Sequence, residues 1–180
     1  MENQVVQVEV TQPGADFDLT QIINGKEIIM PSPVRIHQKI SANLCFEISF
    51  FVRKTKAGEV YSAPFDVILE EGVNRVQPDI LFVRQDRLHI IRNFVEGAPD
   101  LVVEIISPGS FDLDNVEKKA LYARFGVPEY WIVEPRLKLI EVFSLEGGNY
   151  KLNNYAVESG TITSPLLPGF SVDLESIFEG

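Results

Sequence analysis

Hydrophobic positions divide this 180-residue chain into one segment with helical spacing and several shorter runs typical of strands. In residues 34–54, apolar residues stand three or four positions apart, at 36, 40, 44, 48 and 51, which predicts an amphipathic helix. Three apolar runs follow, and turn residues separate them, so they predict three successive strands. These runs are EVYSAPFDVILEE, VQPDILFV and APDLVVEIIS.

In the second half of the chain, the spacing of hydrophobic residues again changes from that of a helix to that of strands. Residues 114–126 predict a second helix, which ends at a glycine. Residues 129–135, 138–145 and 149–157 then predict strands joined as hairpins, and the tail predicts a strand and a short helix. Since strands and helices do not alternate as in a doubly wound sheet, the order predicts a mixed α/β fold with α+β-like order.

Composition and breaks in the pattern suggest one folded domain. Hydrophobic residues make up 45% of the chain and charged residues 23%, which is ordinary for a globular protein. Residues 1–16 are expected to form an N-terminal arm, because Pro13 and Gly14 interrupt the pattern there, and residues 17–180 a single domain. No apolar run reaches the roughly 20 residues of a membrane span, and the start lacks a signal-peptide pattern. A cytoplasmic location without membrane contact is therefore expected.

The net charge of −10 bears on the kind of partner. Binding to the phosphates of a nucleic acid needs concentrated Lys and Arg, and the chain has no basic tract. The overall charge thus argues against strong nonspecific nucleic-acid binding. A local basic groove or bound divalent cations would change this balance locally.

Glu104 is the ionisable residue in the middle of the apolar strand at 100–106. Both faces of this strand are otherwise apolar, so it is expected to be central and covered on both sides. A buried carboxylate must be hydrogen-bonded, paired with a cation or bound to a metal ion. From the strand alone, a structural ion pair and a functional role are equally good explanations.

Two aspartates are candidate partners of Glu104. Asp100 lies four residues earlier on the same strand, which separates the two α-carbons by roughly 13 Å. Asp79 opens a different strand, and pairing of neighbouring strands would bring its carboxylate close to Glu104. Geometry therefore favours Asp79, and Asp100 is interpreted as a residue that opens its strand. Two converging carboxylates would suit Mg²⁺ or Mn²⁺.

Other side chains are candidates to complete such a site. On a helical wheel of residues 115–125, Lys118 falls among the apolar positions, so it must find an anionic partner or extend to solvent. Solvated lysines that offset Glu117 are the alternative. His37, near the start of the first helix, is a candidate to assist the attacking water, and Glu27 is a candidate third acidic ligand. For both, a surface role is the simpler alternative.

Five segments resemble, in order, the bacterial Uma family, which is described as restriction endonucleases within the PD-(D/E)xK nuclease superfamily. They are GKEIIMPSPVRIHQKISANL, VQPDILFV, APDLVVEIISPGS, EKKALYARFGVPEYWIVEP and LLPGF, and the resemblance covers roughly residues 17–178. It implies a restriction-endonuclease-like fold with a central four-stranded mixed sheet flanked by helices. The C-terminal hairpins would be additions to that fold. The resemblance also implies Mg²⁺-dependent hydrolysis of phosphodiester bonds in DNA.

The resemblance also implies roles for single residues. Asp79 resembles the motif aspartate and Glu104 the motif glutamate, with the Ile105 carbonyl as a further metal ligand. The superfamily lysine would stand two residues after the glutamate, where this chain has Ile106. A lysine on the following helix takes its place in the Uma family, and Lys118 fits that position.

The leading hypothesis is thus a metal-dependent DNA endonuclease. The alternative is a catalytically inactive nuclease-fold protein that serves as a binding or assembly module, which the acidic charge and Ile106 keep open. A glycosidase with two carboxylates gives Lys118 no role and is the weaker reading. The C-terminal hairpins are expected to support a homodimer, which would suit double-strand cleavage by symmetry.

Overall fold

The computed structural model describes residues 19–30, 32–107 and 113–179, except for the side chains of residues 114 and 115. The N-terminal arm expected at residues 1–16 lies outside the described residues. Within the described ranges, no helix has both the length and the apolar character that crossing a membrane requires.

A mixed six-stranded sheet forms the centre of the fold, with the strand order β11-β10-β9-β8-β6-β3. Its strands are β3 (Gly58–Ser62), β6 (Ile80–Arg84), β8 (Leu101–Ile105), β9 (Glu129–Glu134), β10 (Leu139–Glu146) and β11 (Asn149–Val157). β8 and β9 run parallel, whereas the other neighbours in the sheet are antiparallel. The four strands from β6 to β10 thus carry an additional strand at each edge.

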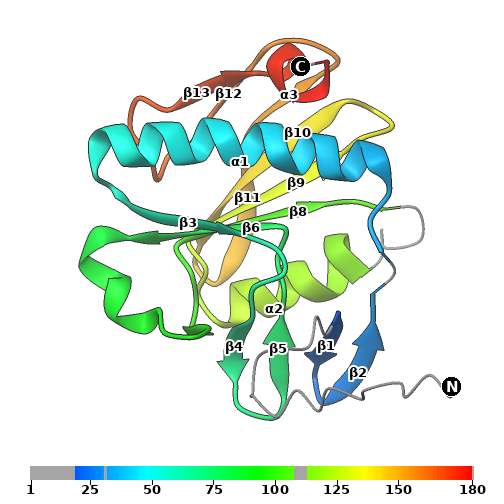
Figure 1. Cartoon of the computed structure of the whole chain (residues 1–180), viewed down its shortest axis with the longest axis vertical. Coiled ribbons are helices and arrows are strands. Elements are labelled where there is room, and N and C mark those ends of the chain that lie inside the picture. Colours follow the sequence, from blue (N-terminus) through cyan, green and yellow to red (C-terminus); the bar gives the residue numbers. More distant parts are fainter. Residues whose placement is uncertain (1–18, 31, 108–112, 180) are drawn as a thin grey trace, which may run out of the picture.

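Helix α1 (Arg35–Thr55) covers one face of this sheet (Figure 1). The helix predicted for residues 34–54 is confirmed, but its buried stripe begins at His37, since Ile36 is exposed. The rest of the stripe follows the four-residue spacing of one helix face: Ile40, Leu44, Ile48 and Val52. These side chains pack on residues of β6, β8 and β9 that point to the same side.

The opposite face of the sheet is covered by α2 (Lys119–Arg124), which continues a π-helical turn, η2 (Leu113–Lys118). Leu121 and Tyr122 pack there against the alternate residues of the same strands. Gly126 follows the helix with a φ of +78°, a left-handed conformation that glycine adopts without strain. The second predicted helix therefore exists, with a π-helical first half.

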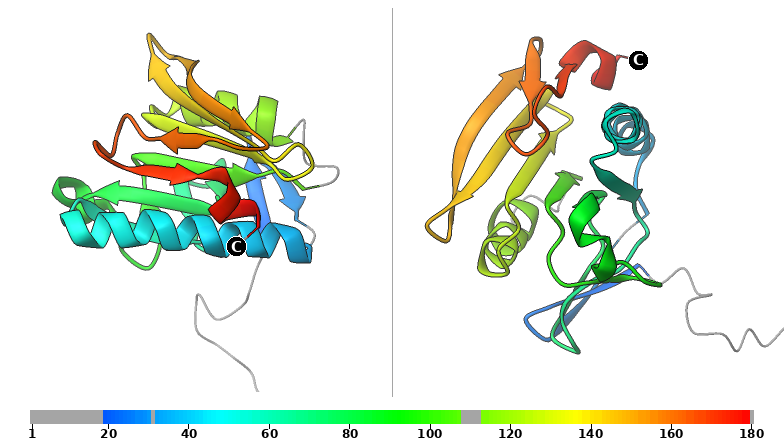
Figure 2. Two further views of the ribbon diagram at one scale, coloured as in Figure 1. Left: turned by 90° about the horizontal axis from the view of Figure 1, so that it is seen from above. Right: turned by 90° about the vertical axis from the view of Figure 1, so that its left-hand side faces the viewer.

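A second, five-stranded sheet with the order β2-β1-β5-β4-β7 lies on the α2 side (Figure 1). Its strands are β1 (Thr20–Ile23), β2 (Lys26–Ile29), β4 (Val67–Glu70), β5 (Asn74–Val76) and β7 (Val95–Glu96). A short 3₁₀ helix, η1 (Gln85–Ile90), follows β6. On the α1 side lie β12 (Thr161–Thr163), β13 (Ser171–Asp173) and α3 (Leu174–Phe178), as Figure 2 shows. The amide of Asn43 in α1 donates to the Ile177 carbonyl of α3 at 2.9 Å.

One predicted element is wrong in its extent. The run EVYSAPFDVILEE was predicted as one strand, but it forms β3 and β4, which belong to different sheets. The break falls around Pro64, which has no N–H to donate to a sheet. β1 and β12, which the sequence pattern did not predict, are strands of four and three residues in which buried side chains alternate with more exposed ones.

The packing of α1 yields a stability prediction with an internal control. Leu44→Ala removes a fully buried side chain and is expected to lower the free energy of unfolding by about 2–5 kcal/mol. Phe46→Ala, two residues away on the same helix, truncates a side chain that is 65% exposed and should change it by less than about 0.5 kcal/mol. Urea unfolding of both variants measures the difference. Equal effects would contradict the assignment of the buried face of α1.

Candidate active site

The pairing of β6 with β8 sets the two candidate acidic residues opposite each other in the sequence register. Ile80 is paired with Val103 in this antiparallel ladder, and Leu81 with Val102. Continuing the register by one residue puts Asp79, just before β6, opposite Glu104 in β8. Directly opposed residues of antiparallel strands share a face and lie roughly 4.5–5.5 Å apart at their β-carbons. Asp79, rather than Asp100, is therefore the acidic residue that stands opposite Glu104 in this register.

The Asp79 carboxylate links β8 to the start of α1. Its Oδ2 accepts a hydrogen bond from the backbone N–H of Ile105 at 2.7 Å. The next N–H along the chain, that of Ile106, donates to the Val133 carbonyl of β9. The N–H of Ile105 therefore points to the other side, toward β6, and it does so beyond the last residue pair of the β6–β8 ladder. Oδ1 of Asp79 lies 3.3 Å from Nε2 of His37, whose side chain is buried. His37 therefore lies beside the candidate Asp79 carboxylate and is not a surface residue.

The Glu104 carboxylate is buried, with 3% of the residue exposed, and each of its oxygens has a partner from the helix below the sheet. The Lys118 ammonium donates to Oε2 at 3.0 Å and forms an ion pair there. The Tyr122 hydroxyl donates to Oε1 at 2.7 Å. Lys118 is itself only 2% exposed, so the ion pair is shielded from water on both sides. Such shielding strengthens the attraction and makes the loss of either partner costly.

The helix sequence explains why both partners reach the same carboxylate. Lys118 and Tyr122 are four residues apart, which places their side chains on one helix face. Ile106, at the position of the superfamily lysine, points to the same side of β8 as Glu104 but is buried in the apolar core. The cation that the strand lacks is therefore supplied from the helix.

The next lysine along the helix has a different environment. The Lys119 ammonium lies 3.2 Å from the centroid of the Phe143 ring, in a cation–π contact. Burial lowers the pKa of Lys119, and the charge of Glu141 partly offsets this. The two neighbouring lysines thus have separate anchors, one a carboxylate and the other an aromatic ring.

The donor atoms suit a hard divalent cation. Among the described residues, no three His, Cys, Asp or Glu side chains form a ready-made metal cluster. Mg²⁺, however, is commonly held by one or two carboxylates and completes its shell with waters and substrate phosphates. Asp79 and Glu104 offer two carboxylates, and the Ile105 carbonyl is expected on the Asp79 side, because the N–H and C=O of a strand residue point to the same neighbour. The residues present therefore fit Mg²⁺ or Mn²⁺.

Glu27 is not brought to this site. It lies exposed in β2, the edge strand of the five-stranded sheet, and has no hydrogen bond or ion pair with the described residues around Glu104. Its role as a third acidic ligand stays a prediction without support from the geometry.

Asp100 lies at the opposite end of β8 and is fully buried. Its Oδ2 accepts from the backbone N–H of Arg84 at 2.9 Å. Its Oδ1 contacts the Arg84 Nε at 3.0 Å and the Arg87 Nη1 at 2.8 Å. These contacts tie the start of β8 to the end of β6, in agreement with a role in opening the strand.

The sequence interpretation did not predict the role of two residues. Tyr122 is one of them, although its spacing of four residues from Lys118 is a signal that its hydroxyl shares the same partner. Glu129, at the start of β9, is a buried carboxylate that accepts hydrogen bonds from Trp131, Ser164 and Leu166. Burial raises the pKa of Glu129, and these donors oppose that rise. Its contacts fix the segment before β13 to the central sheet.

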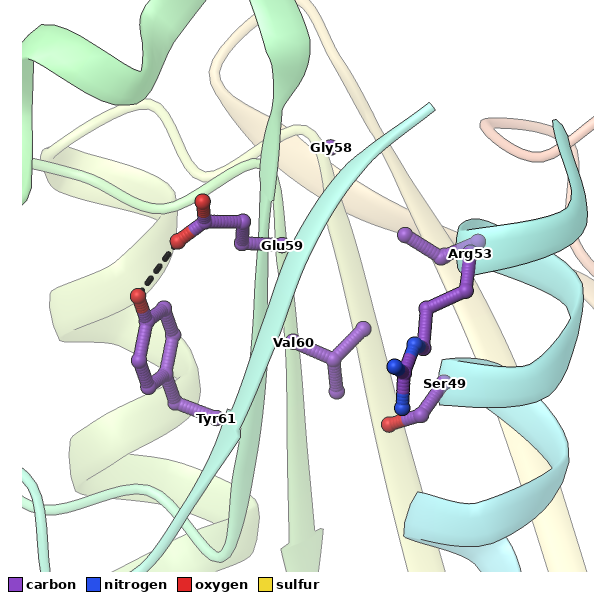
Figure 3. A pocket seen from close by; sticks show the side chains of 7 residues that line it. Ser49, Arg53, Gly58, Glu59, Val60 and Tyr61 are labelled. Atoms are coloured by element: carbon purple, nitrogen blue, oxygen red, sulfur yellow. Dashed lines mark hydrogen bonds between the residues drawn. The ribbon is translucent and has the colours of Figure 1, made fainter. Parts of the chain in front are cut away.

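A pocket of about 320 Å³ lies between the second half of α1 and β3 (Figure 3). Its lining includes Arg53 and Val60, and beside them the Tyr61 hydroxyl donates to Glu59, which raises the pKa of Tyr61 to about 12. Neither candidate carboxylate lines this pocket.

Comparison with known proteins identifies the family and the fold of the chain. A family model described as "Uma2: Putative restriction endonuclease" matches residues 4–175. The chain belongs to this family. The resemblance noted from the sequence motifs is thereby confirmed. No curated protein matches the chain.

A solved structure has the same fold. It is described as "a putative nuclease belonging to DUF820 from Anabaena variabilis", and it superposes with a TM-score of 0.75. The match covers 89% of this chain and 89% of that one, at 18% sequence identity. At this identity the likeness establishes the fold, which is the expected restriction-endonuclease-like fold.

The contacts of Asp100 predict a purely structural effect of its removal. Asp100→Ala leaves two partly exposed arginines without their carboxylate and is expected to lower the free energy of unfolding by about 2–3 kcal/mol. Asp86→Ala removes an exposed carboxylate 3.7 Å from the same Arg84 and should cost less than about 0.5 kcal/mol. Thermal and urea unfolding compare the two. An Asp100 variant as stable as the Asp86 variant would rule out the strand-tying role.

Proposed function

We propose that this protein is a Mg²⁺- or Mn²⁺-dependent DNA endonuclease, a hydrolase that cleaves phosphodiester bonds. The observation that carries the proposal is the register that sets Asp79 opposite Glu104 at adjoining strand ends, with the buried ammonium of Lys118 on Glu104. Membership in a family described as restriction endonucleases, and the fold shared with a protein described as a nuclease, support the same activity.

In this proposal, Asp79 and Glu104 hold the divalent ion, with the Ile105 carbonyl as a further ligand. The bound ion would make water a better nucleophile and offset negative charge on the phosphate. Both carboxylates are already oriented by the protein, Asp79 by the Ile105 N–H and Glu104 by the Tyr122 hydroxyl. Such orientation lowers the cost of assembling the site.

Lys118 and His37 act on the reacting groups from two sides. The Lys118 ammonium would stabilise the charge that develops on the phosphate oxygens as the P–O bond breaks. His37, beside Asp79, would orient the attacking water or accept its proton. The two side chains come from elements on opposite faces of the sheet, Lys118 from η2 and His37 from α1.

The enzyme is proposed to act as a homodimer, so that two sites face two DNA strands. β11 is an edge strand of the large sheet, and it leaves Tyr155 and Val157 exposed. These two side chains point to the same face, because they are two residues apart in the strand. Exposed apolar side chains on the last strand of a sheet are a suitable surface for pairing with a second copy.

Cleavage of supercoiled plasmid tests the proposed activity. With Mg²⁺ or Mn²⁺ the wild-type protein should nick or linearise the plasmid, and EDTA should stop the reaction. Asp79→Asn and Glu104→Gln are expected to lower the rate by at least about a hundredfold, because each removes a charge from the metal site. Asp100→Asn is the matched control: it changes a buried acid of the same sheet at the other strand end and should retain the cleavage rate per folded molecule.

If the wild type and the variants behave alike with every divalent ion, the nuclease proposal fails. The inactive binding or assembly module then becomes the better interpretation. Equal loss in Asp100→Asn and Asp79→Asn, with both proteins folded, would contradict the assignment of the site to the Asp79 end of the strands.

Sedimentation velocity tests the homodimer. The wild type should sediment as a dimer, and Tyr155→Glu should shift it to the monomer, because a charge at the open edge resists burial. Phe46→Glu changes an exposed aromatic residue on α1 and should leave the dimer intact. A monomeric wild type would refute the dimer, and dissociation by Phe46→Glu alone would move the interface to α1.

A further inference from the structure

Glu104 already carries a cation, which affects how a divalent ion can use it. The Lys118 ammonium lies 3.0 Å from Oε2, and both residues are almost completely buried. In such a medium, charges a few ångströms apart interact far more strongly than they do in water. The pair therefore neutralises a carboxylate that would otherwise be too costly to bury in β8.

A divalent ion on the same carboxylate would stand close to this ammonium. Repulsion between the two cations then exceeds the attraction that holds the Lys118–Glu104 pair, since at similar distances in the same medium the divalent ion carries twice the charge of a carboxylate. Glu104 is consequently expected to bind one cation at a time, either the ammonium or the divalent ion. Lys118 has the longer and more flexible side chain of the pair, so it is the group that can move away.

We propose that Lys118 is the built-in counterion of the metal-free site, and that the divalent ion displaces its ammonium from Glu104. This inference rests on the proposed function, because it requires Asp79 and Glu104 to bind the ion. Its consequence is an order of events: the Lys118 ammonium becomes available to the DNA phosphate only after the ion has taken over the charge of Glu104.

Tyr122 makes such an exchange possible without disturbing the strand. Its hydroxyl holds Oε1 at 2.7 Å, whereas Lys118 is on Oε2, so one anchor of Glu104 remains when the other leaves. The Tyr122 ring is fully buried and lies 5.5 Å from the ring of Tyr130, which in turn lies 5.4 Å from that of Tyr150. Tyr122 is thus a positioning residue in a packed aromatic row, and Lys118 is the part that moves.

Metal affinity of the full-length protein, measured by electron paramagnetic resonance of Mn²⁺, tests the exchange without reference to activity. Lys118→Met keeps the length and apolar stem but removes the competing charge. It should tighten Mn²⁺ binding on the order of tenfold, the scale at which neighbours of metal ligands change affinity. Lys119→Met is the matched control, because Lys119 has its anchor on Phe143 and should leave the affinity unchanged. Glu104→Gln should lose the site.

A measurement on the wild type covers the case that Lys118→Met does not fold. Reductive methylation followed by mass spectrometry reports how accessible each lysine is. Saturating Mg²⁺ should raise the labelling of Lys118 several-fold, because its ammonium leaves a buried ion pair, while Lys119 should label equally with and without Mg²⁺.

The outcomes separate this inference from the nuclease proposal. Tighter Mn²⁺ binding by Lys118→Met, or metal-dependent labelling of Lys118, supports the exchange. Unchanged or weaker Mn²⁺ binding by a folded Lys118→Met, or constant labelling at saturating Mg²⁺, overturns it, even if the wild type cleaves DNA. If Mn²⁺ binding does not depend on Glu104, the exchange is overturned as well. The plasmid assay decides the activity independently.

Discussion

The burial of one carboxylate within a central strand governs the arrangement of the molecule around β8. Glu104 cannot lie between two apolar layers unless a cation and a hydrogen-bond donor come with it. Lys118 and Tyr122 meet both needs from the helix beneath the sheet. The position of this helix, the identity of its inward-facing residues and the chemistry available at the strand end are therefore consequences of the same requirement.

The sheet buries three acidic residues, and their different partners separate structure from chemistry. Asp100 contacts two arginines at the beginning of β8. Glu129, at the same end of β9, has only neutral donors among its described contacts, and burial raises its pKa. Glu104, at the other end of β8, lies opposite a second carboxylate, that of Asp79. An acidic residue opposite it in the neighbouring strand distinguishes Glu104 from Asp100 and Glu129, whose contacts connect parts of the sheet.

The amino-acid pattern predicted much of this arrangement and failed for identifiable reasons. Strand periodicity was enough to place Glu104 on a covered strand and to prefer Asp79, because strand pairing fixes which residues lie opposite each other. The helix of Lys118 followed from its apolar stripe. The pattern could not predict the division of residues 59–71 between two sheets, since both halves have strand periodicity and only their tertiary partners differ. It also could not predict that His37 is buried, because a polar residue in a first helical turn is compatible with either environment.

The position of the cation has a mechanical consequence. A lysine two residues after the glutamate would move with β8, which is fixed between β6 and β9. Here that position is Ile106, which belongs to the core, and the ammonium comes from a helix attached to the sheet by Leu121 and Tyr122. The distance between the Lys118 ammonium and Glu104 therefore depends on how α2 packs on the sheet. A substitution that shifts this helix would therefore alter the charge balance of the site without changing any of its carboxylates. A lysine on β8 itself would keep its place beside Glu104 when the helix shifts.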